Sequence, residues 1–359
     1  MNNIYVAIMA GGIGSRFWPA SRINKPKQFL DILNTGQTLI QSTYERFLKI
    51  APKDNIFIVT NEAYLELVHE QLPDIKPSRI LAEPMRRNTG PCIAYVSHKI
   101  ATIDPDANII VAPSDHLILN EQKFLEVMYQ GLEYTFSHDD LVTLGIKPTR
   151  PDTGYGYIQY DDHTIMPGIH KVKTFTEKPD KELAKTFVSS GDFLWNSGIF
   201  IWNVKSILTA FEKHLQDINH AFSAAQKFFG KPEEAAAIEK AYSLCTNISI
   251  DFGLMEKASN VFVIPSSFGW SDLGTWTSLW SNYSSDYWGN AVNGKQVLMY
   301  DSKDCMVIAP ENKLVVLQGL DDYVVVDSGD VLLVCKKDQE QHLKEITSDI
   351  KRYLGDTYL

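Results

Sequence analysis

Residues 5–29 read YVAIMAGGIGSRFWPASRINKPKQF, and this stretch carries the strongest structural signal in the chain. Its first five residues are apolar, which is typical of a buried strand that stops at Gly11-Gly12. The glycines that follow let backbone N–H groups approach an anion, and Met1–Leu30 contains basic residues but no acidic one. The pattern predicts a phosphate-binding loop after the first strand, with a plain glycine turn as the alternative.

Strand-like and helical segments alternate over the first two thirds of the chain. Short apolar runs such as Ile56–Thr60 and Ile109–Ala112 are separated by amphipathic stretches such as Leu39–Ile50. This alternation predicts an α/β fold, Rossmann-like and mostly parallel, with ligands at the carboxyl ends of the strands. After Gly154 the pattern becomes less regular, which indicates an antiparallel portion in the same mixed sheet.

The last part of the chain has a different pattern. A turn-rich segment, Tyr287–Asn293, is followed by short β runs separated by turns, as in a small β-helix-like unit. We therefore predict a large domain over residues 1–286 and a small β domain over residues 287–359. A charged helix, Lys337–Leu354, ends the chain, and its apolar stripe either mediates self-association into a homodimer or covers the β unit.

Composition excludes several classes of partner. The 359 residues are 44% hydrophobic and 22% charged, with a net charge of −10, as in a globular acidic protein. Nucleic-acid polymers and anionic membranes attract basic surfaces, so neither is an expected partner. No stretch approaches the roughly 18 apolar residues of a membrane span, and the start lacks a signal-peptide pattern. The widely spaced cysteines indicate reduced thiols, which predicts a cytoplasmic protein.

Several motifs together resemble one enzyme family. Residues 11–29, GGIGSRFWPASRINKPKQF, are similar to the signature of the sugar-1-phosphate nucleotidylyltransferases, and Trp18-Pro19 with Pro26–Phe29 resembles the mannose-1-phosphate guanylyltransferase branch. Six further segments follow in the family's order: EPMRRNT (83–89), PSDH (113–116), TGYGY (153–157), FTEKP (175–179), WNSG (195–198) and WSDLGTW (270–276). The resemblance covers nearly the whole chain. It is closest to the short, monofunctional form, which implies that isomerase activity is absent.

The resemblance implies an activity and a set of site residues. The implied enzyme transfers GMP from GTP to α-D-mannose 1-phosphate, releasing pyrophosphate, with Mg²⁺ and no covalent intermediate. The implied nucleotide contacts are Ala10, Gly11, Gly12, Gly14, Ser15, Arg16, Lys27, Glu83, Asn88, Thr89 and Asp115. The implied sugar-phosphate contacts are Gly154, Tyr155, Glu177, Lys178 and Asn196. Arg16, Lys27 and Lys178 are the catalytic cations, and Asp115 and Asp272 hold the metal.

The chemistry of these residues fits those roles, although each has a structural alternative. Two carboxylates from separate loops, Asp115 and Asp272, suit a Mg²⁺ that keeps waters and phosphate oxygens, whereas either alone would be a turn or cap residue. Glu83 can accept the adjacent N–H groups of guanine, or be a solvated turn residue. Lys178 can hold a monophosphate beside Glu177, or form a surface ion pair with it.

Two other functions stay open. Hexose stereochemistry cannot be read from Glu177 and Asn196, so another hexose 1-phosphate or another nucleoside triphosphate is an alternative substrate. A non-catalytic nucleotide-sugar sensor is the second alternative. Such a sensor would be expected to lose the basic loop or a metal aspartate, and this chain keeps both.

Overall fold

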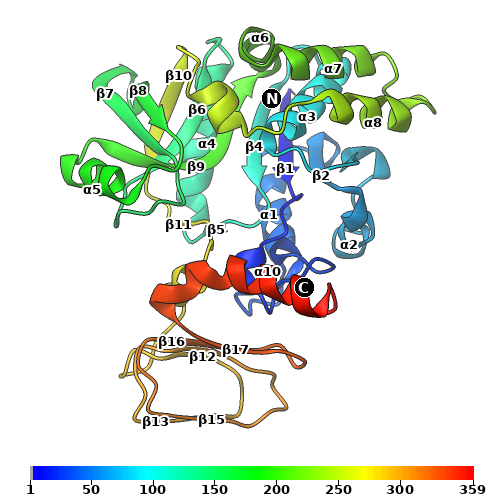
Figure 1. Ribbon diagram of the computed structural model, residues 1–359. Coiled ribbons are helices and arrows are strands. Elements are labelled where there is room, and N and C mark those ends of the chain that lie inside the picture. Colours follow the sequence, from blue (N-terminus) through cyan, green and yellow to red (C-terminus); the bar gives the residue numbers. More distant parts are fainter. Residues whose placement is uncertain (1–2) are drawn as a thin grey trace. The chain divides into compact units, whose positions relative to one another are not determined.

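The computed structural model describes residues 3–359, except for the side chains of residues 162–165. The chain forms two compact units, each described here by itself (Figure 1). Unit 1 comprises Met1–Gly11, Thr43–Ser114 and Ile118–Trp270, and unit 2 comprises Gly12–Ser42, Asp115–Leu117 and Ser271–Leu359. The glycine loop therefore belongs to the same compact unit as the C-terminal segments. The domains 1–286 and 287–359 remain a prediction from the sequence pattern.

Unit 1 is built on one sheet with the strand order β3-β2-β1-β4-β9-β6-β10-β8-β7. Its parallel half consists of β1 (Ile4–Met9), β2 (Ile56–Asn61), β3 (Ile80–Glu83) and β4 (Asn108–Pro113). Its mixed half consists of β6 (Leu141–Ile146), β7 (Tyr157–Met166), β8 (Ile169–Thr176), β9 (Phe193–Asn203) and β10 (Val261–Ser266). Because β9 runs antiparallel to both β4 and β6, the predicted antiparallel insertion in an α/β fold is confirmed.

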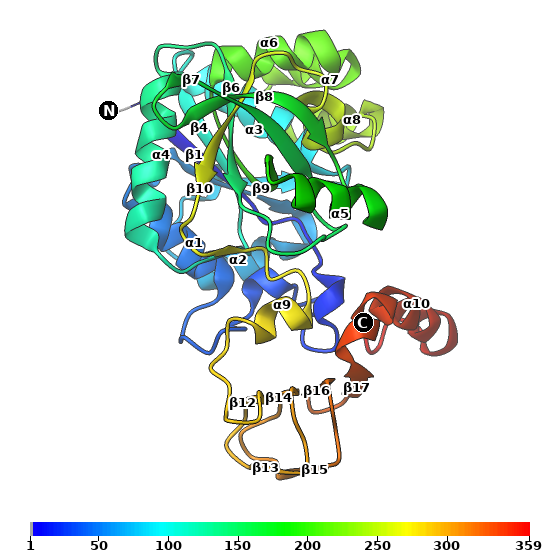
Figure 2. The ribbon, with the colours of Figure 1, turned by 90° about the vertical axis from the view of Figure 1, so that its left-hand side faces the viewer.

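Helices cover both faces of this sheet (Figure 2). On one side α4 (Glu121–Thr135) contacts β6, β9 and β10, and on the other α3 (Thr89–Ile103), α6 (Val204–His214), α7 (Gln216–Gln226) and α8 (Glu234–Leu244) pack together. Three shorter helices are α1 (Leu39–Leu48), α2 (Leu65–Gln71) and α5 (Lys181–Ser190). Tyr95 of α3 stacks on Phe222 of α7, and Tyr242 of α8 meets Phe222 edge-on. No helix in the described part of the chain is long and apolar enough to cross a membrane.

Strands β10 and β12 were missed by the sequence analysis. β10 (Val261–Ser266) contains Pro265, a residue that argues against a strand interior, and here it lies near the end of the strand. β12 (Ala291–Asn293) falls in the segment expected to be a turn-rich break. Both strands are paired by long-range contacts with segments distant in sequence, which local patterns do not reveal.

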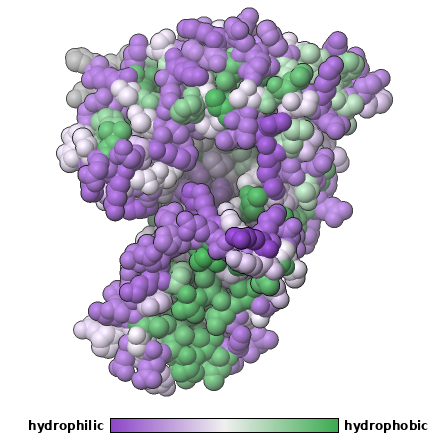
Figure 3. All heavy atoms as spheres, viewed as in Figure 1, coloured by the Kyte–Doolittle hydropathy of each residue, from purple (hydrophilic) through white to green (hydrophobic). Residues whose placement is uncertain are grey.

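The C-terminal part of unit 2 coils into two small sheets. One contains β12, β14 (Met306–Ile308) and β16 (Tyr323–Asp327) in parallel, with β17 (Leu332–Lys336) antiparallel at its edge. The other pairs β13 (Val297–Tyr300) with β15 (Val315–Gln318). Apolar side chains such as Val307 and Val325 fill the interior, and others lie exposed on the coils (Figure 3). This arrangement confirms the predicted β-helix-like unit.

A second apolar core joins the glycine loop to the C-terminal segments of unit 2. Phe17, in the short helix η1 (Ser15–Phe17), lies 4.8 Å from Trp276 between ring centroids, where α9 (Trp276–Trp280) begins. The terminal helix α10 (Leu343–Leu354) buries Leu343 in the same core, whereas Leu354 is 60% exposed. The start of the predicted apolar stripe therefore covers the chain's own unit 2. The helix is shorter than predicted, because residues 337–342 form a 3₁₀ turn, η7.

Replacing Leu343 with alanine is predicted to destabilise unit 2. Removing a fully buried leucine side chain leaves a cavity, at a cost of about 2–5 kcal/mol in unfolding free energy. Leu354→Ala, on the same helix but exposed, is the matched control and should change the unfolding free energy by less than about 0.5 kcal/mol. Urea denaturation followed by tryptophan fluorescence measures both. Equal stability of the two variants would contradict the packing of α10 described above.

Candidate active site

One pocket of unit 2 brings together several of the residues predicted to bind phosphate and both residues predicted to bind metal, whereas Ala10, Gly11, Gly12 and Lys178 do not line it. It has a volume of about 340 Å³, within the size range of small-ligand sites. It is lined by Gly14, Ser15, Arg16, Phe17, Lys27, Asp115, His116, Asp272, Leu273, Gly274 and Lys344. The glycine loop, the segment after β4 and the loop before α9 thus all contribute, although they are far apart in sequence.

Lys27 connects these three segments. Its side chain is buried, and its Nζ lies 2.9 Å from Asp115 Oδ2 and donates a hydrogen bond of 2.6 Å to the backbone carbonyl of Asp272. Burial raises the pKa of Asp115, but the positive charges of Lys27 and His116 outweigh it and hold that pKa below its usual value. Asp115 is therefore a carboxylate at neutral pH, as a metal ligand must be.

The glycine loop needs glycine at position 14. Gly14 has a φ of 67°, and a Cβ placed there would lie 2.5 Å from the Cβ of Lys27. Ser21 Oγ donates to the carbonyl of Ile13 and Gln28 Nε2 to that of Gly12, both at 2.9 Å. These bonds fix the loop carbonyls within unit 2, so the path of the backbone is set before any ligand binds.

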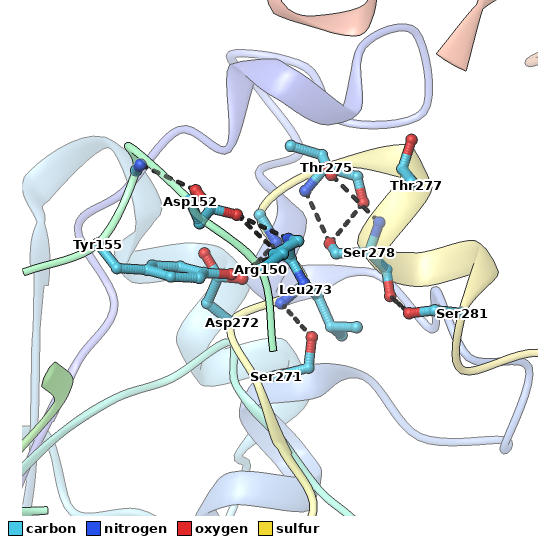
Figure 4. A network of polar contacts seen from close by, with 12 residues as sticks. Arg150, Asp152, Tyr155, Ser271, Asp272, Leu273, Thr275, Thr277, Ser278 and Ser281 are labelled. Carbon is cyan, nitrogen blue, oxygen red and sulfur yellow. Dashed lines mark hydrogen bonds and ion pairs between the residues drawn. The ribbon is translucent and has the colours of Figure 1, made fainter. Parts of the chain in front are cut away.

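Asp272 lies in a tight turn that leads into α9 (Figure 4). The buried Leu273 has a φ of 45°, and its N–H donates to Ser271 Oγ at 3.1 Å. Asp272 Oδ1 accepts from the Gly274 N–H at 2.9 Å, and a Cβ at position 274 would collide with the carboxylate. Thr275 and Ser278 then form a capping box that starts the helix.

The donor set of this pocket fits a largely hydrated divalent cation. Two carboxylates, Asp115 and Asp272, line the same pocket. Within residues 3–359, as far as their side chains are described, no cluster of three or more His, Cys, Asp or Glu could enclose a metal. A cation held there would complete its shell with water or phosphate oxygens, which is the habit of Mg²⁺.

The residues predicted to bind the sugar phosphate lie together in unit 1. A Cβ at Gly156 would lie 2.6 Å from Glu177 Oε2, so only glycine leaves room for this carboxylate. The Asn196 N–H donates to the Gly156 carbonyl at 2.8 Å, and the Lys178 N–H to the Tyr155 carbonyl at 3.2 Å. The side chains of Glu177 and Lys178 form an ion pair. Lys178, which was predicted to bind a phosphate, is therefore paired with Glu177 in this structure.

Asp251 is a member of this group that the sequence analysis missed. Asn196 Nδ2 donates to Asp251 Oδ1 at 2.8 Å, while Asn196 Oδ1 accepts from Thr143 Oγ1 at 2.9 Å. Burial and the nearby charge of Glu177 raise the pKa of Asp251 to about 7. An acidic residue inside an apolar segment, ISIDFGLM, was the available signal. The amide of Asn196 is thus oriented by the chain, and two acidic groups lie near it.

The loop before β7 contributes a second missed residue, Arg150 (Figure 4). Arg150 forms an ion pair with Asp152 at 2.7 Å and lies 5.2 Å from the ring centroid of Trp195. Asp152 Oδ1 accepts from the Gly154 N–H at 2.8 Å, and the Tyr155 ring meets Trp195 edge-on. These contacts shape the segment that contains Gly154 and Tyr155.

The residues predicted to contact the base have structural partners in unit 1. Glu83 is only 7% exposed, and its Oε1 accepts from the Tyr242 hydroxyl at 2.9 Å. Burial raises its pKa to about 7, against the lowering effects of Tyr242 and Arg86. Its other oxygen faces Gly11, where a Cβ would lie 2.8 Å away. Glu83 is therefore a buried residue beside Gly11, and the solvated-turn alternative is excluded.

Three smaller candidates in unit 1 are held by hydrogen bonds within the chain. The Ala10 carbonyl accepts from Thr60 Oγ1 at 2.9 Å. Asn88 caps the start of α3, where its side chain accepts from the Thr89 N–H. Thr89 Oγ1 accepts from the Ile250 N–H at 2.9 Å, next to Asp251. Asn88 and Thr89 therefore link the start of α3 to the segment that contains Asp251.

Comparison with known proteins identifies the family. Residues 5–287 match the family model described as nucleotidyl transferase, and residues 295–350 match a MannoseP isomerase/GMP-like beta-helix domain. The chain belongs to the nucleotidyl transferase family. This nucleotidyl transferase is 37% identical over 348 residues to the alginate biosynthesis protein AlgA of Pseudomonas fluorescens, covering 96% of the chain and 71% of AlgA.

Two further relatives carry mannose-1-phosphate in their names. The mannose-1-phosphate guanylyltransferase of Salmonella muenchen is 34% identical over 356 residues, 98% of this chain and 74% of the relative. A solved structure from Thermus thermophilus, named mannose-1-phosphate geranyltransferase, has a TM-score of 0.87 and 30% identity, and covers 97% of this chain and 99% of its own. The predicted family and the predicted fold of this nucleotidyl transferase are confirmed.

The raised pKa of Asp251 predicts how stability depends on pH. Its pKa is about 7 in the folded chain against an ordinary 3.8, so the folded state holds this proton more tightly than the unfolded state. Its stabilising contribution is complete below about pH 4 and is lost as the pH rises to about 7. Asp251→Asn should therefore raise the unfolding free energy at about pH 8, by an amount on the order of 1–4 kcal/mol, and leave it nearly unchanged at about pH 4.

Denaturation at a series of pH values measures this effect. Asp217→Asn is the control with the opposite sign, because its hydrogen bonds to Thr246 and other groups hold the pKa of Asp217 below its ordinary value despite burial. That variant should lose stability at neutral pH. A pH dependence of Asp251→Asn identical to that of the wild type would contradict the buried, protonated carboxyl.

Proposed function

We propose that the chain transfers GMP from GTP to α-D-mannose 1-phosphate, giving GDP-mannose and pyrophosphate. The observation that carries the proposal is the pocket of unit 2, in which two cations of the glycine loop and two carboxylates line one space of ligand size. The name of the Salmonella muenchen relative supports the choice of substrates. Cations neutralise the charge of the phosphates, and the paired carboxylates coordinate the divalent metal that accompanies a nucleoside triphosphate.

The reaction leaves little covalent work to the protein. A phosphate oxygen of mannose 1-phosphate attacks the α-phosphorus of GTP, forming one P–O bond as the bond to the departing pyrophosphate breaks. Arg16 and the backbone N–H groups of Gly11, Gly12 and Gly14 hold the triphosphate, whereas the Ala10 N–H donates to the Val59 carbonyl at 2.7 Å. Positioning and charge neutralisation supply the rate enhancement, and no enzyme-bound intermediate forms.

Asp115 and Asp272 would hold Mg²⁺. Their placement in one pocket, and the lowered pKa of Asp115, support this assignment. Bound there, the ion would neutralise phosphate charge as it develops in the transition state. Lys27 then has a positioning role, because its ammonium keeps Asp115 against the loop that carries Asp272.

The sugar phosphate is assigned to the group around Glu177 in unit 1. Lys178 binds the phosphate, which requires it to exchange its ion pair with Glu177 for the ligand. Glu177 then accepts hydrogen bonds from hexose hydroxyls, and Asn196 offers its remaining N–H. Gly154 and Tyr155 provide backbone and ring surface beside the sugar. When Lys178 moves to the phosphate, the Glu177 carboxylate, whose side chain is 11% exposed, loses this ion pair, and the hexose hydroxyls would replace it with hydrogen bonds.

The base is assigned to Glu83, Asn88 and Thr89. Guanine presents two neighbouring N–H donors, and a carboxylate can accept both. Tyr242 already donates a hydrogen bond to Glu83 Oε1. One N–H of the base would therefore donate to Oε1 together with Tyr242, and the other would donate to Oε2. The free cysteines support a cytoplasmic location for the enzyme.

A pyrophosphate-release assay tests the proposal. Purified chain with Mg²⁺ is given each combination of four nucleoside triphosphates with mannose, glucose and galactose 1-phosphates. GTP with mannose 1-phosphate should give the highest kcat/KM, because Glu83 matches guanine and the Salmonella muenchen relative is named for mannose 1-phosphate.

Three results would overturn separate parts of the proposal. A different best pair would replace the substrate assignment but keep the reaction class. Nucleotide binding without pyrophosphate release from any pair would favour the sensor. A preference for GTP that survives Glu83→Gln would remove Glu83 from base recognition.

Asp272→Asn tests the metal assignment. Asparagine keeps the oxygen that accepts from the Gly274 N–H, so the turn should persist. Turnover should fall by about 100-fold or more, because the charge stabilisation supplied by a divalent ion is worth several kcal/mol. Asp349→Asn, an exposed change of the same charge on α10, is the control and should behave as wild type. Circular dichroism checks the fold, and near-normal turnover of Asp272→Asn would exclude it as a ligand.

A further inference from the structure

The pocket of unit 2 contains a cation that comes from the C-terminal helix. Lys344, the second residue of α10, lines the same space as Arg16, Asp115 and Asp272. Its residue type and its position in a charged amphipathic helix gave no reason to single it out in the sequence. Lys344 is exposed, and its position at this pocket distinguishes it from an ordinary surface lysine.

The three cations of the pocket differ in how they are engaged. Lys27 is buried and already bonded to Asp115 and to the carbonyl of Asp272, so most of its donors serve the chain. Arg16 and Lys344 form no ion pair with any residue whose side chain the structure describes, and both face the pocket. They are the lining cations whose charge remains available to an anionic ligand.

The position of Lys344 is set by contacts of the residues directly before it. Leu343, directly before it, is fully buried in the core that also contains Phe17 and Trp276. Upstream, Glu340 Oε2 accepts from the Thr277 N–H at 3.0 Å, which ties the segment to α9.

The far end of the helix is also tied to the glycine loop. There Trp18 Nε1 donates to the Tyr358 carbonyl at 2.6 Å, and α10 contacts the η1 turn that contains Arg16. A helix anchored at both ends holds its first turn beside the loop without help from a ligand.

Charge balance explains what such a lysine would do. A nucleoside triphosphate carries more negative charge than one divalent cation and one arginine neutralise, and the pyrophosphate product is a still more concentrated anion. An ammonium group is a compact charge that reaches phosphate oxygens without demanding a fixed geometry. Lys27 is poorly placed to supply this charge, because it is buried and using it for a ligand would break its ion pair with Asp115.

We propose that Lys344 binds the β- and γ-phosphates of the nucleoside triphosphate and the pyrophosphate that leaves. The proposal rests on the proposed function for its ligand and adds a substrate-binding residue to it. The C-terminal helix is then part of the active site, and its packing on the glycine loop places a second available cation in the pocket with Arg16.

Titration calorimetry with inorganic pyrophosphate and Mg²⁺ tests the proposal directly. Lys344→Met removes the charge but keeps most of the side chain, and Arg352→Met makes the same charge change on an exposed residue of the same helix that does not line the pocket. Lys344→Met should weaken pyrophosphate binding about tenfold, Arg352→Met less than about twofold, and Lys344→Arg should restore most of the affinity.

Kinetics supply a second readout. Lys344→Met should raise KM for GTP by about the same factor and leave KM for mannose 1-phosphate unchanged. Equal pyrophosphate affinity of Lys344→Met and wild type overturns the proposal, as does an equal loss in Arg352→Met, which would indicate a general charge effect. Wild-type protein that binds pyrophosphate but releases none from any substrate pair overturns the proposed function instead.

Discussion

The bond from the Lys27 ammonium to Asp115 and to the Asp272 carbonyl is the contact on which the rest of the phosphate pocket depends. It joins three segments that are far apart in sequence: the glycine loop, the turn after β4 and the turn before α9. A buried charge is costly unless paired, and breaking such a pair typically costs about 3–5 kcal/mol because the other charge stays buried. Lys27 is therefore a structural and an electrostatic element at once.

The two groups of candidate residues are built on different physical supports. The phosphate group in unit 2 rests on tight turns, with positive φ angles at Gly14 and Leu273, and on the aromatic core around Phe17 and Trp276. The sugar group in unit 1 rests on regular strands, because Asn196 lies within β9 and Glu177 follows β8 directly. Turns bring backbone N–H groups close to an anion, while strands hold side chains in a fixed order. Each support suits the ligand assigned to it.

Much of the fold and of the candidate site could be predicted, because many candidate site residues lie in recognisable local sequence patterns. The apolar run before Gly11 and the basic loop after it predict a strand followed by a loop for anions. The strand is present, and two of the loop's cations, Arg16 and Lys27, line a pocket. Asp251 and Lys344 were missed for a common reason, since what singles them out is packing with segments far away in sequence. Glu83 is a related case, because the sequence left a solvated-turn interpretation open and only the structure, in which Glu83 is buried against Tyr242, excludes it. Charge burial depends on tertiary contacts, and no local pattern encodes them.

Unit 2 is assembled from discontinuous pieces, and this has a consequence for how the protein is made. The glycine loop is synthesised early, but the side chains that pack on Phe17 and Trp18 come from the end of the chain. Until those residues leave the ribosome, the two large aromatic groups have no complete core to enter. Unit 1 has nearly all of its strands by then, so the glycine loop is a late-folding element attached to an early-folding sheet. Synthesis interrupted within the β coils would yield a folded sheet with an unformed phosphate pocket.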